Sequence, residues 1–293
     1  MDPTARLADR IAPGATLVRR WPLTGGVSAQ VEALELALPD GTRRCVVLRR
    51  HGAAAWKPLA ADVTATEFNL LSALAAAGMP VPEPLLLDIS ADLFGSPFFV
   101  MEFVDGATEI DAAALPDALQ KMAEYLLRLH SLQLELPSLP TGEDPVAGAL
   151  NHLPPGDPLC AALREIGTLA PTNARALVHG DFWPGNILWK DRSIAAVLDW
   201  EDAAFGDPLA DVAGCRLELL WKYGPDAADT FAAHYLSRAA IDRAHLPFWE
   251  LYAASAALAF MSEWGLDPAR EADMRRKAAS VIADARGAIL RRS

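Results

Sequence analysis

The pattern of apolar and polar positions in the first hundred residues is mainly that of strands. Residues 30–38 alternate in part, the turn residues Pro39-Asp40-Gly41 follow, and residues 45–48 continue as an apolar second strand. Residues 97–104 form a further apolar run. Residues 62–77 interrupt the strands with helical spacing and end at a glycine followed by three prolines. The N-terminal part is therefore predicted to be a sheet with one helix.

After residue 106 the spacing of apolar residues becomes helical. Residues 115–132 repeat at helical spacing, and the chain from Pro208 onward is mainly helical, with breaks near one glycine and two prolines. Between them, residues 137–158 are rich in proline and glycine and predict a loop or lid, whereas residues 187–199 predict a short hairpin. Strands first and helices later indicate an α+β fold with two lobes.

The change in character places a domain boundary and a hinge near Asp105-Gly106. We predict an N-terminal lobe over residues 1–104, made of an antiparallel sheet and one helix. The larger, mainly helical C-terminal lobe is predicted over residues 105–293.

The composition is that of a globular protein, and the net charge limits the kinds of partner that the protein is expected to bind. Of the 293 residues, 52% are hydrophobic and 22% are charged, which is not a disordered composition. The formal net charge of −12 repels nucleic acid and anionic lipid, so we expect neither nucleic acid nor a membrane as a partner. The apolar run at residues 251–261 is too short to span a bilayer, and the charged first ten residues lack the apolar core of a signal peptide. Three widely spaced cysteines suit a reducing compartment, so the expected location is cytoplasmic.

The strongest chemical signal is the sequence His179-Gly180-Asp181-Phe182-Trp183-Pro184-Gly185-Asn186. A strand, a turn and a second strand then lead from Asn186 to Asp199. Because a hairpin brings its two ends together, we expect Asp181, Asn186 and Asp199 to converge. Phosphoryl transfer uses such a set, in which one carboxylate takes the proton of the attacking hydroxyl while an amide oxygen and a second carboxylate hold Mg²⁺. The alternative reading is a polar loop that carries a capping Asp and a turn-forming Asn.

This loop resembles the catalytic loop of kinases, H-R-D-x-x-x-x-N, with Gly180 in place of the Arg, as in the aminoglycoside phosphotransferase and choline kinase superfamily. The resemblance implies a bilobal, protein-kinase-like fold, with ATP and Mg²⁺ as cofactors and Asp181 as the catalytic base. It implies that Asn186 and Asp199 are metal ligands. Glu201, two residues after Asp199, is either a further metal ligand or an acid that bonds backbone.

A second stretch, residues 206–213, matches the G-D-P-x-x-D-[LV]-A pattern of the same superfamily. Asp207-Pro208 is expected to open a helix, because proline is favoured in a first turn. The resemblance implies that Asp211 supports the backbone of the catalytic loop and that His179 shapes this loop. Since the segment 199–207 is too short for a phosphorylated activation loop, a small-molecule acceptor is favoured over a protein.

The N-terminal half supplies candidates for nucleotide binding. Gly25, Gly26 and Ser28 lie in a glycine-containing turn between two predicted strands, where backbone N–H groups can cover phosphates. By the resemblance, Arg49 takes the place of the strand lysine that pairs with the α- and β-phosphates. Arg50 is the neighbouring alternative for this role.

Glu67 falls on the apolar stripe of the predicted helix 62–77. A carboxylate on an apolar stripe needs a partner, and the kinase pattern supplies one, a strand Arg or Lys, here Arg49. The alternative reading is an acid near the helix N-terminus, where the helix dipole favours negative charge.

Residues 99–106 resemble the kinase linker between lobes. In that linker the backbone groups of Glu102 and Val104 would bond the adenine edge, whereas their side chains would be incidental. The resemblance extends over about residues 20–215, and beyond them only the helical pattern continues.

We therefore expect an ATP-dependent phosphotransferase that moves the γ-phosphate to a hydroxyl of a small molecule, such as an aminoglycoside, an amino alcohol or another metabolite. The acceptor is expected among the C-terminal helices, where acidic and aromatic residues favour a cationic molecule, although aromatics at helical spacing also form cores. The candidates there are Glu218, Trp221, Tyr223, Trp249, Glu250, Tyr252, Glu263 and Trp264.

Two other functions fit part of the pattern. A pseudokinase-like sensor would bind nucleotide without turnover. A metal-dependent hydrolase could use His179, Asp181 and Asp199 as ligands, but it would leave Arg49 and Glu67 unexplained.

Overall fold

The computed structural model describes residues 2–23, 29–51 and 60–291. The chain divides into two compact units. Unit one comprises residues 1–107 and 194–201, and unit two comprises residues 108–193 and 202–293. The segment 194–201 thus belongs to unit one, although in sequence it lies between the two stretches that make up unit two. Among the described residues, no helix is both long enough and apolar enough to span a membrane.

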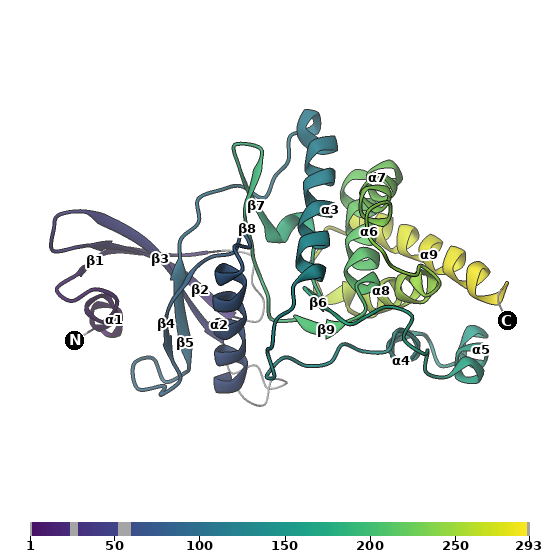
Figure 1. The fold of residues 1–293 in the computed structure, drawn as a ribbon, viewed down its shortest axis with the longest axis horizontal. Coiled ribbons are helices and arrows are strands. Elements are labelled where there is room, and N and C mark those ends of the chain that lie inside the picture. The colour runs from purple at the N-terminus through teal and green to yellow at the C-terminus, as the bar shows by residue number, and fades with distance from the viewer. Residues whose placement is uncertain (1, 24–28, 52–59, 292–293) are drawn as a thin grey trace. The chain divides into compact units, whose positions relative to one another are not determined.

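Unit one is built on a five-stranded antiparallel sheet with the strand order β1-β2-β3-β5-β4 (Figure 1). Its main elements are α1 (Pro3–Ile11), β1 (Thr16–Pro22), β2 (Ala29–Ala37), β3 (Arg43–His51), α2 (Ala60–Ala76), β4 (Pro84–Asp88) and β5 (Phe98–Glu102).

The two faces of this sheet pack against different helices. Because successive strand residues point to opposite faces, the neighbours Phe98 and Phe99 on β5 enter different layers. Phe98 packs in a cluster with Leu7 of α1 and Leu34 of β2. Phe99 instead meets Phe68 of α2, with the ring centroids 6.2 Å apart. The helix α2 therefore holds its residues against the face opposite to that covered by α1.

The strands β2, β3 and β5 and the helix α2 occupy the predicted segments, whereas α1 was not predicted. The side chain of Asp2 caps α1 by accepting from the backbone N–H of Thr4 at 3.1 Å, and Pro3 stands in the first turn. Leu7 is completely buried, so α1 belongs to the core of unit one.

Unit two is mainly helical (Figure 1). Its short antiparallel sheet pairs β6 (Ala176–Val178) with β9 (Ala204–Gly206). Its main helices are α3 (Leu115–Ser131), α4 (Pro145–His152), α5 (Leu159–Ile166), α6 (Leu209–Tyr223), α7 (Pro225–Leu236), α8 (Leu246–Phe260) and α9 (Pro268–Leu290). Three-residue 3₁₀ turns cover η1 (Ala112–Ala114), η2 (Pro184–Asn186) and η3 (Met261–Glu263). The α+β class predicted from the sequence is confirmed.

The segment 137–158 was predicted to be a loop, and this prediction was wrong for its middle part, which forms α4. Asp144 caps this helix by accepting from the backbone N–H groups of Val146 and Ala147, both at 3.0 Å. Pro145 reads as a breaker in the sequence, but it stands at the first helical position, where no hydrogen bond from its nitrogen is required.

The strands β7 (Ile187–Lys190) and β8 (Ser193–Val197) follow one another as predicted. The two residues that join them, Asp191 and Arg192, have φ angles of 50° and 61°. Two successive left-handed residues are the signature of the tight turn that favours hairpins.

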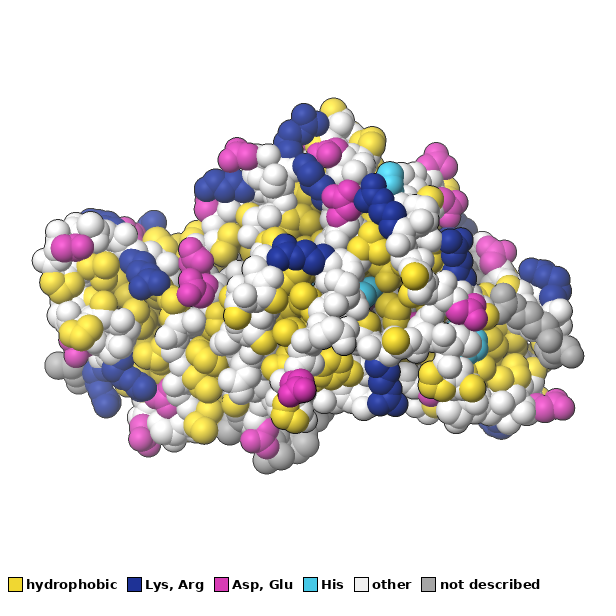
Figure 2. Space-filling view, viewed as in Figure 1, with side chains coloured by type: hydrophobic (Ala, Val, Ile, Leu, Met, Phe, Trp, Pro, Cys, Tyr) yellow, Lys and Arg dark blue, Asp and Glu magenta, His cyan; other side chains and the backbone are white. Residues whose placement is uncertain are grey.

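Charged side chains of both signs are scattered over the face seen in Figure 2, with apolar patches between them. On this face the excess of acidic residues is not gathered into one negative surface. The net charge of the chain therefore does not point by itself to a binding site there.

Candidate functional site

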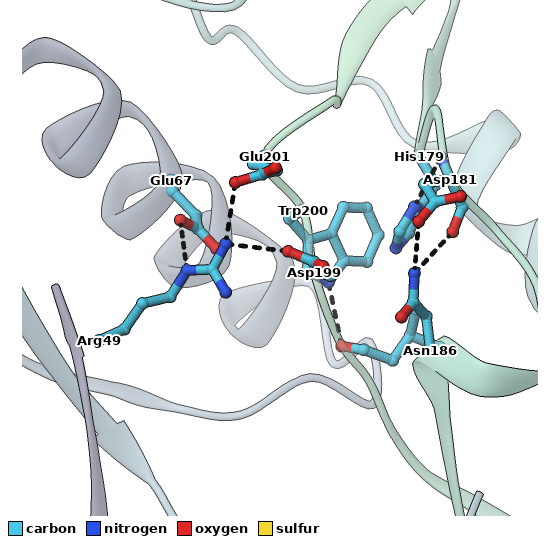
Figure 3. A network of polar contacts seen from close by, with 9 residues as sticks. Arg49, Glu67, His179, Asp181, Asn186, Asp199, Trp200 and Glu201 are labelled. Atoms are coloured by element: carbon cyan, nitrogen blue, oxygen red, sulfur yellow. Dashed lines mark hydrogen bonds and ion pairs between the residues drawn. The ribbon is translucent and has the colours of Figure 1, made fainter. Parts of the chain in front are cut away.

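Arg49 on β3 is surrounded by acidic side chains of unit one (Figure 3). Its Nε donates to Glu67 Oε2 on α2 at 3.1 Å, so the predicted ion pair between these two residues is present. Its Nη2 donates to Asp199 Oδ1 at 2.9 Å and to Glu201 Oε2 at 3.2 Å. These last two contacts, which join residues 150 and 152 positions apart, were not predicted.

The depth of Arg49 explains why it needs these partners. Its side chain is 6% exposed, and that of Glu67 is 4% exposed. Burial alone would lower the pKa of Arg49, but the charges of Glu67, Asp199 and Glu201 raise it above its usual value, so the guanidinium stays charged. Three carboxylates around one guanidinium leave an excess of negative charge. Arg49 Nη1 makes no hydrogen bond to a described residue and remains available as a donor.

Asp199 has a left-handed backbone, with φ at 62°. A residue other than glycine seldom adopts this conformation unless its surroundings impose it. The next residue, Trp200, is 2% exposed, and its Nε1 donates to Val197 O at 3.0 Å. The buried indole thus anchors the segment and presents the Asp199 carboxylate, which is 27% exposed, to Arg49.

Arg50, the alternative candidate for phosphate contact, points elsewhere. Its Nη2 donates to Glu32 Oε2 on β2 at 3.1 Å, and its guanidinium lies 5.1 Å from the ring centroid of Phe94. Because neighbouring strand residues face opposite sides of the sheet, Arg50 cannot share the surroundings of Arg49. The structure therefore favours Arg49 as the candidate.

The stretch that resembles a linker begins at the end of β5. The backbone N–H of Glu102 donates to Glu83 O at 2.8 Å, so this N–H is already committed. The backbone N–H of Val104 makes no hydrogen bond to a described residue. An adenine ring could therefore use the N–H of Val104, but only the carbonyl oxygen of Glu102.

In unit two, Asp181 lies on the loop between β6 and η2, and Asn186 stands at the end of η2 (Figure 3). Asn186 Nδ2 donates to Asp181 Oδ2 at 2.8 Å and to Asp181 O at 2.9 Å. The backbone N–H of Asp181 donates to Nδ1 of His179 at 3.2 Å, and His179 is fully buried. Asn186 thus holds the Asp181 carboxylate, and the hydrogen bond to His179 holds the Asp181 backbone.

Asp211, in the first turn of α6, supports the backbone of this loop, as the resemblance implied. Its Oδ2 accepts from the His179 N–H at 2.8 Å, and its Oδ1 accepts from the Gly180 N–H at 2.9 Å. Its Oδ2 also meets Nε2 of His130 at 3.0 Å, and Nδ1 of His130 meets the Tyr235 hydroxyl at 2.7 Å. Burial would raise the pKa of Asp211, but the hydrogen bond and charge of His130, together with the charge and backbone N–H of His179, hold it below the usual value.

The glycine in place of the kinase Arg has a steric cause here. Gly180 has φ at 84°, and a Cβ added there would lie 2.3 Å from the carbonyl oxygen of Asp202. A side chain of any kind would therefore displace the backbone next to Asp181.

Glu218, named above only as one acceptor candidate, has a perturbed acidity. Burial raises the pKa of its carboxyl to about 8, and the negative charge of Asp181 adds to this effect against the opposing charges of Arg270 and Lys222. Glu218 lies seven residues after Asp211 on α6, which puts both side chains on the same helix face. The charge state of an acid two turns along a helix depends on tertiary surroundings and could not be predicted from the sequence.

The other acceptor candidates divide into core and surface residues. Trp221 and Trp249 are buried, and Nε1 of Trp221 donates to Met274 O at 3.0 Å. Glu250 pairs with Arg216, and the Tyr252 hydroxyl donates to Glu143 Oε2 at 2.8 Å. Among the remaining candidates, Tyr223, Glu263 and Trp264, the first is half-buried and the other two are exposed.

Some predicted residues cannot be placed. Gly25, Gly26 and Ser28 lie outside the described residues. Asp181 and Asn186 belong to unit two, whereas Asp199 belongs to unit one, so the predicted convergence of the three stays a prediction.

A family model matches most of the sequence and shows which family the chain belongs to. Residues 22–252 match the model of a family described as "Phosphotransferase enzyme family". The chain belongs to this phosphotransferase family. The match begins at the end of β1 and ends inside α8, so it includes Arg49, Glu67, Asp181 and Asp211. The predicted kinship with the aminoglycoside phosphotransferases is confirmed.

Solved structures of similar fold agree with this family. A putative aminoglycoside phosphotransferase from Ralstonia eutropha JMP134 superposes with a TM-score of 0.70 at 15% identity, covering 99% of this chain and 98% of that chain. A macrolide 2'-phosphotransferase, MphH, from Brachybacterium faecium gives a TM-score of 0.62 at 19% identity, with 95% and 98% covered. At these identities the likeness shows the fold of this phosphotransferase-family protein and nothing more.

Curated relatives are much longer than this chain. Acyl-CoA dehydrogenase family member 11 of Rattus norvegicus is 32% identical over 199 residues, which cover 60% of this chain and 25% of that protein. The protein of the same name from Gallus gallus is 34% identical over 180 residues, covering 53% and 23%. The phosphotransferase-family chain therefore matches about a quarter of the length of these relatives.

Proposed function

We propose that this chain transfers the γ-phosphoryl group of ATP to a hydroxyl group of a small molecule. The observation that carries the proposal is the frame around Asp181, whose loop is hydrogen-bonded to the buried Asp211 and whose carboxylate accepts from Asn186. A general base acts efficiently only when its position is fixed before the reaction. Solved structures of similar fold support ATP as the phosphate donor. The amicoumacin kinase hAmiN was solved with AMP-PNP, and an aminoglycoside phosphotransferase, APH(4)-Ia, was solved with ADP and hygromycin B.

Arg49 is the proposed phosphate contact in unit one. Its Nη1 is available as a donor, and its other nitrogens are fixed by Glu67, Asp199 and Glu201. A guanidinium held in this way donates to phosphate oxygens without a large loss of side-chain freedom. We also propose that the backbone of Val104 and the carbonyl of Glu102 meet the adenine. The turn with Gly25, Gly26 and Ser28 stays the candidate cover of the phosphates.

Magnesium fits the donors that the chain offers. Asn186 uses its amide nitrogen for Asp181, and its Oδ1 makes no hydrogen bond to a described residue. Asp199 Oδ2 also makes no hydrogen bond within the described part of the chain, and both atoms are hard oxygen donors of the kind that Mg²⁺ prefers. We assign Asn186 and Asp199 as ligands, with Glu201 as a further candidate. The bound metal would neutralise charge on the triphosphate.

Asp181 is proposed to orient the acceptor hydroxyl and to receive its proton. A bond forms between the hydroxyl oxygen and the γ-phosphorus, while the bond from that phosphorus to the β,γ-bridging oxygen breaks. ADP leaves with the electron pair, and the proton passes to the Asp181 carboxylate. The nucleotide is held by other residues, so Asp181 acts on the acceptor alone.

The acceptor is proposed to be small and preferentially cationic. The support is the net charge of −12 and the acids on the C-terminal helices, of which Glu250 is paired with Arg216. One solved structure of similar fold, an aminoglycoside phosphotransferase, is a complex with the small molecule kanamycin.

The test is a panel of hydroxyl compounds in cationic, neutral and anionic classes, incubated with Mg·ATP while ADP release is followed. We expect acceptor-dependent ADP release in the cationic class. Phosphorylation only of neutral or anionic compounds would overturn the cationic part alone. If nucleotide binds tightly but no compound in any class is phosphorylated, the chain fits a nucleotide-binding sensor and the proposed transfer is wrong.

A further inference from the structure

The helix α6 begins beside the loop that carries Asp181. In its first turn, Asp211 accepts from the backbone N–H of Gly180, the residue before Asp181, at 2.9 Å. Gly214 and Glu218 follow three and seven residues after Asp211, so all three lie on one face of α6. All of these residues belong to unit two. This face of α6 therefore starts at the Asp181 loop and continues with Gly214 and Glu218.

Gly214 leaves open space on this face of α6. A Cβ added to Gly214 would meet no described atom within 4 Å, apart from its own stretch of helix. Gly148 of α4 differs, because a Cβ there would lie 2.7 Å from the ring of Tyr252, so close packing explains that glycine. Glycine is a poor residue for the middle of a helix, and no such packing accounts for Gly214. Its lack of a side chain instead leaves room for a ligand.

Glu218 lies one helical turn beyond this space. Its carboxyl group makes no hydrogen bond or ion pair with a residue that the structure describes. The side chain is half-buried, and its carboxyl oxygens keep some exposed surface, unlike the sealed indole nitrogen of Trp249. Burial and the negative charge of Asp181 raise the pKa of Glu218 to about 8, against the opposing charges of Arg270 and Lys222. Glu218 is therefore an acid that a ligand can reach and that the chain itself leaves without a partner among its described residues.

The surroundings of Glu218 favour a positively charged ligand. A second negative charge near Asp181 is unfavourable until a positive charge joins the two carboxylates. Lys222 does not supply it, because its Nζ meets Glu109 Oε1 at 3.2 Å. Cys215, on the same helix, stays a neutral thiol because burial raises its pKa well above the usual value. A ligand with an ammonium group therefore supplies the charge that Glu218 lacks.

We propose that the acceptor lies over Gly214, with its hydroxyl at Asp181 and an ammonium group at Glu218, so that Gly214 and Glu218 select amino alcohols among hydroxyl compounds. The inference rests on the proposed function, because it takes Asp181 as the group that orients the acceptor hydroxyl. Gly214 acts by leaving room for the acceptor, and Glu218 acts by its negative charge.

The test compares two probes of nearly the same shape. Choline is an alcohol with a fixed positive charge, and in 3,3-dimethylbutan-1-ol a carbon atom replaces the charged nitrogen. Their dissociation constants are measured by NMR titration of ¹³C-labelled methyl groups of the full chain at constant ionic strength, without Mg·ATP. The pKa of Glu218 is about 8, so this side chain is mainly ionised at pH 9 and mainly neutral at pH 6. The preference for choline should therefore be about tenfold larger at pH 9 than at pH 6, the equivalent of one pKa unit.

Glu218→Gln should remove this rise in preference with pH. The matched control is Glu165→Gln, which changes an exposed acid on α5, also in unit two, and should keep the rise. The inference is overturned if wild type shows no rise, or if Glu218→Gln keeps it.

Gly214→Leu tests the open space separately from the charge. Its side chain enters that space, so both probes should bind about tenfold more weakly, whereas Tm should not fall because leucine favours a helix. The control is Gly287→Leu on α9, where an added Cβ meets only the end of the Arg291 side chain, and binding should be unchanged. Wild-type affinity for both probes in folded Gly214→Leu would overturn the inference. Because no turnover is measured, a failure of phosphoryl transfer in the acceptor panel would not alter these binding results.

Discussion

Arg49 in unit one and Asp211 in unit two are both buried charged residues, but their surroundings differ in kind. The two oxygens of Asp211 meet the N–H groups of His179 and Gly180 and the ring of His130, so its hydrogen bonds are complete. Arg49 meets more carboxylates than it can neutralise, and its Nη1 makes no hydrogen bond to any residue that the structure describes.

This difference distinguishes a buried charge that supports the fold from one that can bind a ligand. A buried charge whose partners are complete within the chain stabilises the fold and fixes the backbone around it. A buried charge with an excess of opposite charge around it becomes balanced only when another charged group arrives. The comparison therefore predicts that changes at Asp211 act first on stability, whereas changes around Arg49 act first on the reaction.

The largest expected effect on stability is that of Asp211→Ala. It removes the acceptor for two buried backbone N–H groups and for His130, and should lower the free energy of unfolding by about 3 kcal/mol. Urea denaturation followed by circular dichroism measures this change. Asp211→Asn keeps one acceptor oxygen and should lose clearly less. Equal, small losses for both variants would show that Asp211 does not hold the loop.

The pair Arg49 and Glu67 should show strong coupling in the reaction. Arg49→Gln and Glu67→Gln each break the buried ion pair between these two side chains, so their losses in kcat/KM for ATP should fail to add by about 1–3 kcal/mol. The matched control is the pair Arg50 and Glu32, which lies beside it on the sheet with side chains 23% and 21% exposed. Its coupling should be below about 0.5 kcal/mol, and additive losses for the first pair would mean that the two residues do not act together.

Glu201→Gln should separate reaction from stability. It removes one of the carboxylates that share the Arg49 guanidinium, so the free energy of unfolding without ligand should stay the same or rise by up to about 1 kcal/mol. Turnover with Mg·ATP should fall, because Arg49, the proposed phosphate contact, loses one of the partners that fix it. Denaturation and steady-state kinetics on one preparation test both parts. A large loss of stability with normal turnover would contradict the view that changes around Arg49 act first on the reaction.

A separate effect, on the pH dependence of stability, is expected at Glu218. Its pKa in the folded protein, about 8, lies above the usual value near 4.5, so between these pH values the folded state binds more protons than the unfolded state. This residue's contribution to stability is therefore fully present below about pH 4.5 and is lost as pH rises through 8. Glu218→Gln should remove that part of the pH dependence. The control Glu165→Gln, which changes an exposed acid of unit two, should leave it intact. Identical unfolding midpoints across pH 5–9 for wild type and Glu218→Gln would contradict the assignment.

The sequence predicted the partners that a local pattern defines. Glu67 stands on an apolar stripe and was expected to pair with a cation, and the resemblance of the G-D-P-x-x-D stretch implied that Asp211 supports the loop that carries Asp181. The contacts of Arg49 with Asp199 and Glu201 could not be predicted, because they depend on how a segment far along the chain returns to unit one.

Other features were missed for reasons of tertiary structure. The helix α4 was hidden because Pro145 looks like a breaker, although a capping Asp before it starts a helix. Gly180 is required by the position of the Asp202 carbonyl, which no local pattern reveals.

The most direct test of the proposed transfer is Asp181→Asn, studied by single-turnover kinetics with an acceptor found in the panel and by titration with Mg·ATP. The amide keeps the size of the side chain but removes the base and its charge. The account predicts that the rate of phosphoryl transfer falls by about 10²-fold or more while nucleotide affinity changes little. Near-normal turnover in Asp181→Asn, or a defect that lies wholly in ATP binding, would contradict it.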